Sequence, residues 1–177
     1  MITREQYVPG PAKDARIEKR DGDKWTLVLV RQLRQPPEKV WRAITDPAEL
    51  KEWAPFDVDR NLATVGVTFK LTWVGSPTPI ELTVTRADAP RVLEFTDMRW
   101  ELESVAGGTR LTLWSSLDRR YVAMGAAGWH ICLDGLGQFV DGTPMGRIAG
   151  PSAMKSEGWK DLLRDYAKLL RAEVPSW

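Results

Sequence analysis

The sequence predicts an α+β fold in which a long helix covers one face of an antiparallel sheet, and three patterns support this prediction. Apolar and polar residues alternate at period two through residues 65–117, which is typical of strands with one covered face. Apolar residues then recur at helical spacing in residues 128–141 and again in residues 156–172. Residues 36–53 indicate two short helices before the sheet.

The chain is expected to start with a flexible arm and a hairpin. Residues 1–14 carry scattered charges, prolines and a glycine without periodicity, so we expect a flexible N-terminal arm there. Asp21-Gly22 supplies the chemistry of a turn between two strands within residues 15–33. We see no boundary beyond the arm and expect one domain over residues 15–177.

Residues 36–56 read PPEKVWRAITDPAELKEWAPF and indicate two helices that share one capping residue. Trp41 and Ile44 lie at helical spacing after a Pro-Pro start, which suits the first turn of a helix. Asp46 precedes a proline, so it is placed to end the first helix and to cap the second.

Five strands are expected in residues 65–117, and with the hairpin they make a sheet of six or seven strands. Alternation places a set of apolar side chains on one inward face, namely Phe69, Trp73, Leu82, Phe95, Trp100 and Leu113. Trp114 has the opposite parity to Leu113. It is therefore exposed, covered by another element, or turned inward by a bulge.

A long helix in the C-terminal half is expected to cover the sheet, followed by one more helix at the C-terminus. At about 100° per residue, one stripe of residues 128–141 is apolar. It contains Trp129, Cys132, Leu133, Leu136, Phe139 and Val140. His130 and Asp134 fall on an adjoining stripe.

This order of elements resembles the SRPBCC (START-like) superfamily, in which a curved sheet wraps around a long helix in a helix-grip fold. Residues 36–56 and GWHICLDGL at residues 128–136 are similar to the branch of the heat-shock-protein-90 ATPase activators. The resemblance covers roughly residues 15–172 and implies a cavity between sheet and helix. The superfamily includes lipid carriers, polyketide cyclases and plant hormone binders, so the resemblance does not select one activity.

Composition argues against several classes of function. The chain has 25 basic and 24 acidic residues and a net charge of +1, so no general attraction to nucleic acid or acidic membranes is expected. The apolar run Leu27–Val30 is far too short to cross a bilayer, and residues 1–10 lack the apolar stretch of a secretory signal. The single cysteine allows no intrachain disulfide. A cytoplasmic protein is expected.

His130 and Asp134 are the candidates for catalysis, and both have a structural alternative. His130 is the sole histidine, and Asp134 lies one helical turn later, where a carboxylate could orient the ring of a general base. The alternative is a hydrogen bond that stabilises the helix, and we favour it. Cys132 projects about 200° around the helix from His130, so no metal site is expected, and no phosphate-binding glycine motif indicates a cofactor.

The predicted ligand site is the apolar interior between sheet and helix. Its predicted residues are Trp53, Phe69, Trp73, Leu82, Phe95, Trp100, Leu113, Trp129 and Leu133. A solid core without a cavity is the alternative, because tryptophan also fills wide cores.

The favoured function is a small cytoplasmic protein that binds a hydrophobic or aromatic small molecule, rather than an enzyme. The alternatives are a chaperone-associated regulator and a cyclase or hydrolase that uses a polar pair in the cavity. A chaperone partner is not expected, because the eukaryotic activators have an additional N-terminal domain for which this chain has no room. A homodimer is left open.

Overall fold

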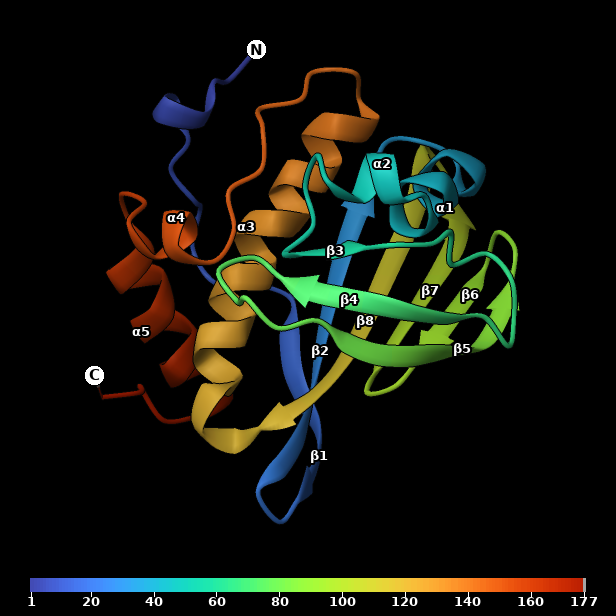
Figure 1. The fold of residues 1–177 in the computed structure, drawn as a ribbon. Helices are drawn as coiled ribbons and strands as arrows, with labels where there is room; N and C mark the ends of the chain where they lie inside the picture. The colour runs from blue at the N-terminus through green and yellow to red at the C-terminus, as the bar shows by residue number, and fades with distance from the viewer. Residues whose placement is uncertain (177) are drawn as a thin grey trace.

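Eight antiparallel strands form one curved sheet that wraps around a long helix, α3 (Figure 1). The computed structural model describes residues 1–176. Its strands are β1 (Ala15–Asp21), β2 (Lys24–Leu33), β3 (Phe56–Val58), β4 (Thr68–Trp73), β5 (Ile80–Asp88), β6 (Val92–Phe95), β7 (Met98–Val105) and β8 (Gly108–Asp118). Its helices are α1 (Pro37–Thr45), α2 (Pro47–Leu50), α3 (Val122–Val140), α4 (Pro151–Met154) and α5 (Trp159–Leu170), with 3-10 turns η1 (Arg4–Gln6) and η2 (Arg119–Tyr121). The predicted helix-grip fold is confirmed.

The sheet has one strand more than predicted. Its order is β1-β2-β8-β7-β6-β5-β4-β3, so β8 joins the first hairpin to the meander. The five strands predicted in residues 65–117 are β4 to β8. The additional strand is β3, which has 3 residues and pairs with the end of β4. A strand of that length shows no alternation in the sequence, so only its pairing reveals it.

The predicted helix pair is present, with the predicted cap. The Asp46 side chain accepts hydrogen bonds from the backbone N–H of Ala48 at 2.8 Å and of Glu49 at 3.4 Å. These bonds satisfy free donors at the start of α2. The indole of Trp53 then donates to the carbonyl of Ala43 at 3.0 Å, which fixes this tryptophan under α1.

The two faces of the sheet differ as the alternation predicted. On β8, Leu111 and Leu113 are fully buried against the helix side. Trp114 pairs in regular register with Arg99 of β7 and with a residue of β2, so no bulge turns it inward. It lies on the outer face, with the Arg99 guanidinium 5.5 Å from its ring centre.

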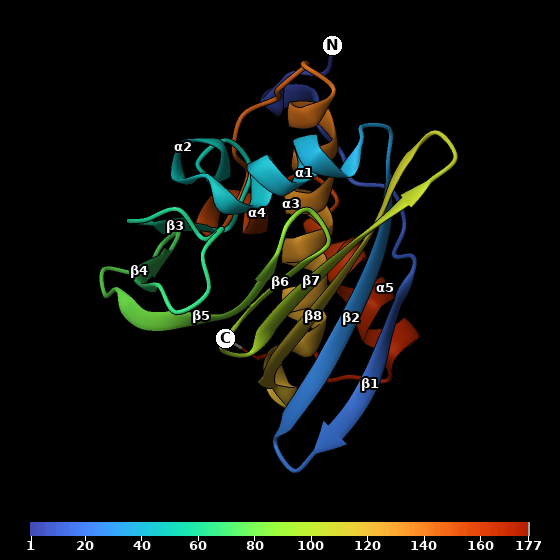
Figure 2. The ribbon, with the colours of Figure 1, turned by 90° about the vertical axis from the view of Figure 1, so that its right-hand side faces the viewer.

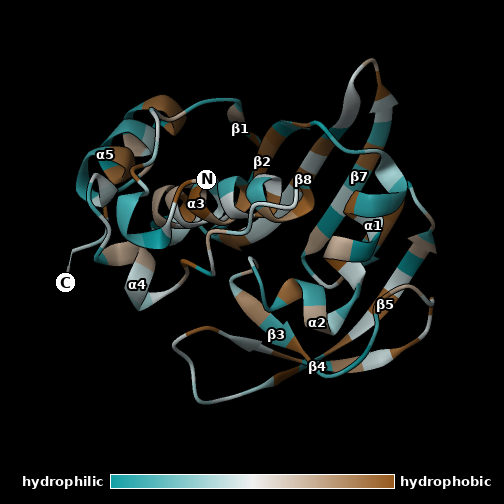
Figure 3. Ribbon diagram, turned by 90° about the horizontal axis from the view of Figure 1, so that it is seen from above, coloured by the Kyte–Doolittle hydropathy of each residue, from teal (hydrophilic) through white to brown (hydrophobic). Residues whose placement is uncertain are grey.

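Helix α3 begins at Val122, six residues before the predicted start at Gly128. The prediction was wrong because glycines in this segment weaken the helical signal of the sequence. The helix is covered by the sheet on one side and by α5 on the other (Figure 3). Figure 2 shows how the β3–β4–β5 end of the sheet curls around it. None of the helices in residues 1–176 is both long and apolar enough to cross a membrane.

A chain of aromatic rings fills the interior between α3 and the helix pair. Trp53 and Trp100 meet edge to face at 6.0 Å, and Trp100 meets Trp129 at 5.4 Å. Phe56 then contacts Trp129 at 6.2 Å and Trp73 at 5.4 Å. Such edge-to-face pairs add to the free energy gained by burial of the rings. Trp53, Phe56 and Trp100 are fully buried in this part of the interior.

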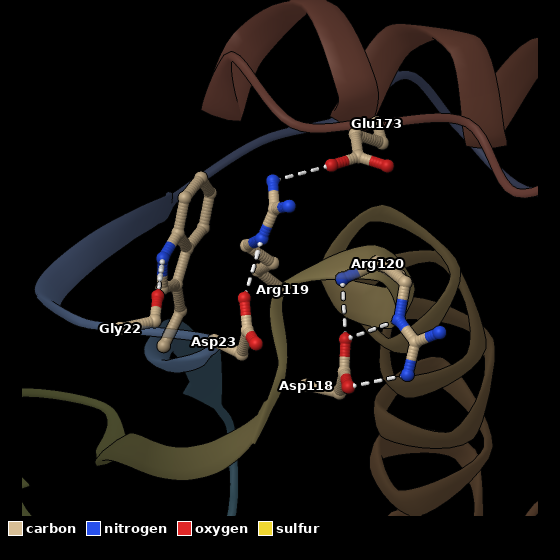
Figure 4. Close-up of polar contacts among 7 residues, drawn as sticks. Gly22, Asp23, Asp118, Arg119, Arg120 and Glu173 are labelled. Atoms are coloured by element: carbon tan, nitrogen blue, oxygen red, sulfur yellow. Dashed lines mark hydrogen bonds and ion pairs between the residues drawn. The ribbon is translucent and has the colours of Figure 1, made fainter.

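Polar contacts hold the junction between β8 and α3 (Figure 4). Arg119 donates to Asp23 of the first hairpin at 2.9 Å and to Glu173 after α5 at 2.6 Å. Asp118 accepts from the side chain and the backbone N–H of Arg120, and these bonds lower the pKa of its carboxyl to about 2. The start of α3 is thereby tied to both ends of the chain.

Two tryptophan substitutions test the assignment of the sheet faces. Trp100→Ala is expected to lower the free energy of unfolding by about 3–5 kcal/mol, because the ring is buried in the aromatic chain. Trp114→Ala, on the outer face of the neighbouring strand, is expected to cost about 1 kcal/mol or less. Urea denaturation measures both. Equal losses for the two variants would contradict the assignment.

Candidate functional site

A cavity of about 440 Å³ lies between the first half of α3 and the sheet. The sheet side is formed mainly by β4 and β5, by the turn between β6 and β7, and by the end of β8. Helix α3 supplies Met124, Gly125, Gly128 and Trp129, and the α4 region supplies Met154 and Trp159. The helix pair α1–α2 packs against the other end of the interior. The cavity lies at the end that the helix pair does not line.

Large apolar side chains surround the cavity while remaining open to solvent. Trp73, Ile80, Tyr121 and Met154 line it and are 37%, 42%, 43% and 42% exposed. Exposed apolar side chains that converge on a concave surface are typical of ligand sites.

Two glycines form the helical wall of the cavity, and they differ in what requires them. A Cβ atom at Gly125 would lie 2.9 Å from Cδ1 of Leu117, so a side chain at this position would displace the end of the Leu117 side chain. A Cβ atom at Gly128 would have no atom within 4 Å. Glycine inside a helix costs about 1 kcal/mol relative to alanine. At Gly128 no packing contact requires a glycine. The absence of a side chain there leaves open space in the cavity.

Four of the nine predicted ligand residues line the cavity: Trp73, Leu82, Phe95 and Trp129. The other five do not line it: Trp53, Phe69, Trp100, Leu113 and Leu133. The physical reason is that Trp53 packs against the second half of α3, with its Cβ 3.7 Å from the Cβ position of Gly135. The predicted set is therefore divided, with four residues lining the cavity and the other five buried elsewhere in the core.

Several cavity residues were missed by the sequence analysis. Tyr121, Met124 and Gly125 precede the predicted start of the helix, so they were not assigned to its inward side. Met154 belongs to α4, which lies between the two predicted helices in a segment for which no helix was predicted. The apolar character of Tyr121 and Met124 at helical spacing was the signal that could have placed them.

His130 lies on the other side of α3, in a buried polar cluster rather than in the cavity. Its side chain is 1% exposed. Nδ1 lies 2.7 Å from the hydroxyl of Tyr166, and Nε2 lies 3.5 Å from Oδ2 of Asp134. Arg31 donates to the Tyr166 hydroxyl at 2.9 Å, and Tyr7 donates to Asp134 at 2.6 Å. The cluster connects β2, α3, α5 and the segment before β1.

The cluster holds His130 neutral. Nδ1 of His130 lies 2.7 Å from the Tyr166 hydroxyl and 3.4 Å from the Arg31 guanidinium. Because a guanidinium can only donate, Nδ1 is placed to accept, with the ring proton on Nε2 facing Asp134. Burial lowers the pKa of His130 to about 4, although Asp134 favours the charged form; the cations Arg31 and Lys13 lower it further. The predicted contact between His130 and Asp134 is therefore present, and it belongs to a buried network of hydrogen bonds outside the cavity.

Cys132 is also buried in the core. Its Sγ atom lies 3.6 Å from the carbonyl of Ile148, and burial raises the pKa of the thiol to about 12. The thiol is therefore protonated and serves as packing, as the sequence indicated. Within residues 1–176, no three His, Cys, Asp or Glu side chains are grouped so that they could hold a metal ion.

The pH dependence of stability tests the burial of His130. Because its pKa falls from 6.5 to about 4 on folding, the unfolded chain binds the extra proton first as the pH decreases. The contribution of His130 to stability is thus complete above pH 6.5 and declines between pH 6.5 and pH 4. We expect the melting temperature to fall less steeply over this range in His130→Asn than in the natural sequence. Parallel curves for the two proteins would show that His130 is not buried neutral.

The fold and sequence were then compared with known proteins. The family model described as "Activator of Hsp90 ATPase homolog 1-like protein" matches residues 34–141, which is more than half of the chain. No curated protein matches the sequence.

Solved structures with the same fold come from several bacteria. A conserved protein of unknown function from Enterococcus faecalis has a TM-score of 0.62 at 19% identity, covering 84% of this chain and 86% of its own. A protein from Staphylococcus saprophyticus has a TM-score of 0.60 at 18% identity, covering 70% and 98%. An AHSA1-like protein from Aeromonas hydrophila has a TM-score of 0.53 at 23% identity, covering 66% and 92%. The family model and the helix-grip fold agree, and the chain belongs to the AHSA1-like family of the SRPBCC superfamily.

Proposed function

We propose that this protein binds a hydrophobic small molecule with a flat or aromatic body in the cavity between α3 and the sheet. The observation that carries the proposal is the cavity itself, with a predominantly apolar lining and a volume of about 440 Å³. That volume lies within the range of about 300–1,000 Å³ that is typical of ligand pockets. Among residues 1–176, Asp97 is the only charged residue that lines it, and Asp97 is paired with Lys24 at 2.5 Å.

The aromatic walls favour a flat ligand. Trp73, Phe95, Trp129 and Trp159 line the cavity, and Tyr121 lies at its edge. Aromatic side chains bind flat apolar molecules through edge-to-face and offset contacts. The proposed compartment is the cytoplasm, where a lone thiol such as that of Cys132 remains reduced.

The alternatives raised by the sequence have less support from the geometry. A cyclase or hydrolase would need polar groups that converge in the cavity, whereas His130 and Asp134 lie outside its lining. A chaperone-associated regulator is suggested by the description of the family. Docking of a regulator through its outer surface does not require an internal cavity, whereas binding of a small molecule does. The cavity therefore favours ligand binding over regulation.

Filling the cavity tests the proposed function directly. The neutral fluorophore N-phenyl-1-naphthylamine is expected to bind the natural protein with a rise in its emission. At a hundredfold excess over the dissociation constant, it should add about 2.7 kcal/mol to the free energy of unfolding. Gly128→Leu is expected to abolish both effects while the protein stays folded, because the open space at Gly128 admits a side chain.

Gly137→Ala is the matched control on the same helix. A Cβ atom there would be in ordinary contact, 3.7 Å from Leu33, and Gly137 does not line the cavity. This variant is expected to gain up to about 1 kcal/mol of stability with unchanged binding of the fluorophore. Equal binding by Gly128→Leu and Gly137→Ala would overturn the proposal.

The regulator alternative is tested with a heat-shock-protein-90 ATPase from the same source. We expect no stimulation of ATP turnover by the purified protein. A rise that depends on its concentration and persists in Gly128→Leu would favour the regulator over the ligand carrier.

A further inference from the structure

The polar side chains that line the cavity are gathered at one edge. The walls that β4, β5 and the α4 region supply are apolar throughout the described chain, and they include Trp73, Ile80 and Trp159. The polar lining residues come from the turn between β6 and β7 and from the end of β8, followed by the residue before α3. They are Thr96, Asp97, Ser115, Ser116 and Tyr121. A ligand that matches this lining is apolar over most of its body and polar at one end.

The register of the sheet holds this polar edge together. Met98 pairs with Ser115, and the backbone N–H of Ser116 donates to the carbonyl of Asp97 at 2.9 Å. Asp97 has a φ angle of 61°, in the left-handed region that aspartate and asparagine adopt more readily than most residues. The backbone at Asp97 is therefore fixed beside the end of β8.

Asp97 brings a negative charge to the edge of the cavity. Its Oδ1 atom lies 2.5 Å from Nζ of Lys24, but Lys24 does not line the cavity. The negative member of this ion pair is therefore the one nearer to the cavity. The two side chains are 47% and 56% exposed, so solvent screens their attraction and a second cation can share the carboxylate at little cost.

The positive charges in the chain beside this edge have partners elsewhere. Arg119 donates to Asp23 at 2.9 Å, and Arg120 donates to Asp118 at 2.8 Å. No lysine or arginine of residues 1–176 lines the cavity. A ligand with a negative charge would therefore meet the Asp97 carboxylate without a basic partner, and like charges placed together oppose binding.

We infer that the ligand is an amphiphile that carries a protonated amine at one end, and that Asp97 holds this amine at the polar edge. This inference rests on the proposed function and narrows its ligand class. A hydrogen bond between an ammonium group and a carboxylate is roughly twice as strong as one between neutral groups. Because Asp97 is half-exposed, the amine stays in contact with water and avoids the cost of burying a charge.

Three naphthalene derivatives of similar shape test the sign of the charge. At neutral pH, 1-naphthylmethylamine is a cation, 1-naphthoate is an anion and 1-naphthylmethanol is uncharged. Isothermal titration calorimetry measures their dissociation constants. We expect the natural protein to bind the amine about three- to tenfold more tightly than the alcohol, and to bind the anion most weakly.

Asp97→Asn removes the charge and keeps the turn, because asparagine also tolerates a positive φ. This variant is expected to bind the amine no more tightly than the alcohol, with the affinity for the alcohol unchanged. Asp88→Asn is the matched control. The Asp88 side chain is 49% exposed, is paired with Arg86 at 2.7 Å and does not line the cavity. The control changes the net charge equally and should keep the preference for the amine.

The results separate this inference from the proposed function. If 1-naphthoate binds as tightly as the amine, or if Asp97→Asn leaves the affinity for the amine unchanged, the inference is overturned while the cavity remains a binding site. If none of the three compounds binds the natural protein, the proposed function fails for flat apolar ligands, and the inference fails with it. A preference for the amine that is lost in Asp97→Asn and kept in Asp88→Asn supports the inference.

Discussion

The burial of α3 around most of its circumference is the constraint on which the structure depends. Residues on every side of this helix are buried, including Ala126, Trp129, His130 and Leu136. A helix that is apolar all round must be enclosed, and one flat sheet cannot enclose it. The eight strands therefore curve around one side, while α5 and the chain after α3 cover the other (Figure 3).

The cavity follows from how this enclosure is completed along the helix. The second half of α3 packs against Trp53, which follows the helix pair. The Trp53 indole N–H donates to the carbonyl of Ala43, which holds the ring in the interior. The first half of α3 borders the cavity, where Gly125 and Gly128 form part of the wall. Gly125 permits close approach to the sheet, whereas Gly128 leaves space. One helix thus borders an aromatic core at one end and the cavity at the other.

The two sides of α3 also separate two chemical environments. The cavity side offers mainly aromatic and aliphatic surface. The opposite side holds the chain of hydrogen bonds from Arg31 through Tyr166 and His130 to Asp134. Burial within this network is the main cause of the low pKa of His130. A buried polar network of this kind favours one arrangement of α5 and the N-terminal segment over others.

The sequence by itself determined most of the elements and the family, but neither β3 nor the start of α3. Local alternation and capping were sufficient for β4 to β8, for the cap at Asp46 and for the outward or inward parity of most strand residues. Only the tertiary structure decided which inward residues line the cavity. Trp73 and Trp100 share the same parity, but Trp100 is enclosed by Trp53 and Trp129, and Trp73 lies at an open edge. The alternation along a strand predicts which face of the sheet a side chain lies on. Whether that face borders a cavity depends on which side chains from distant parts of the chain pack against it.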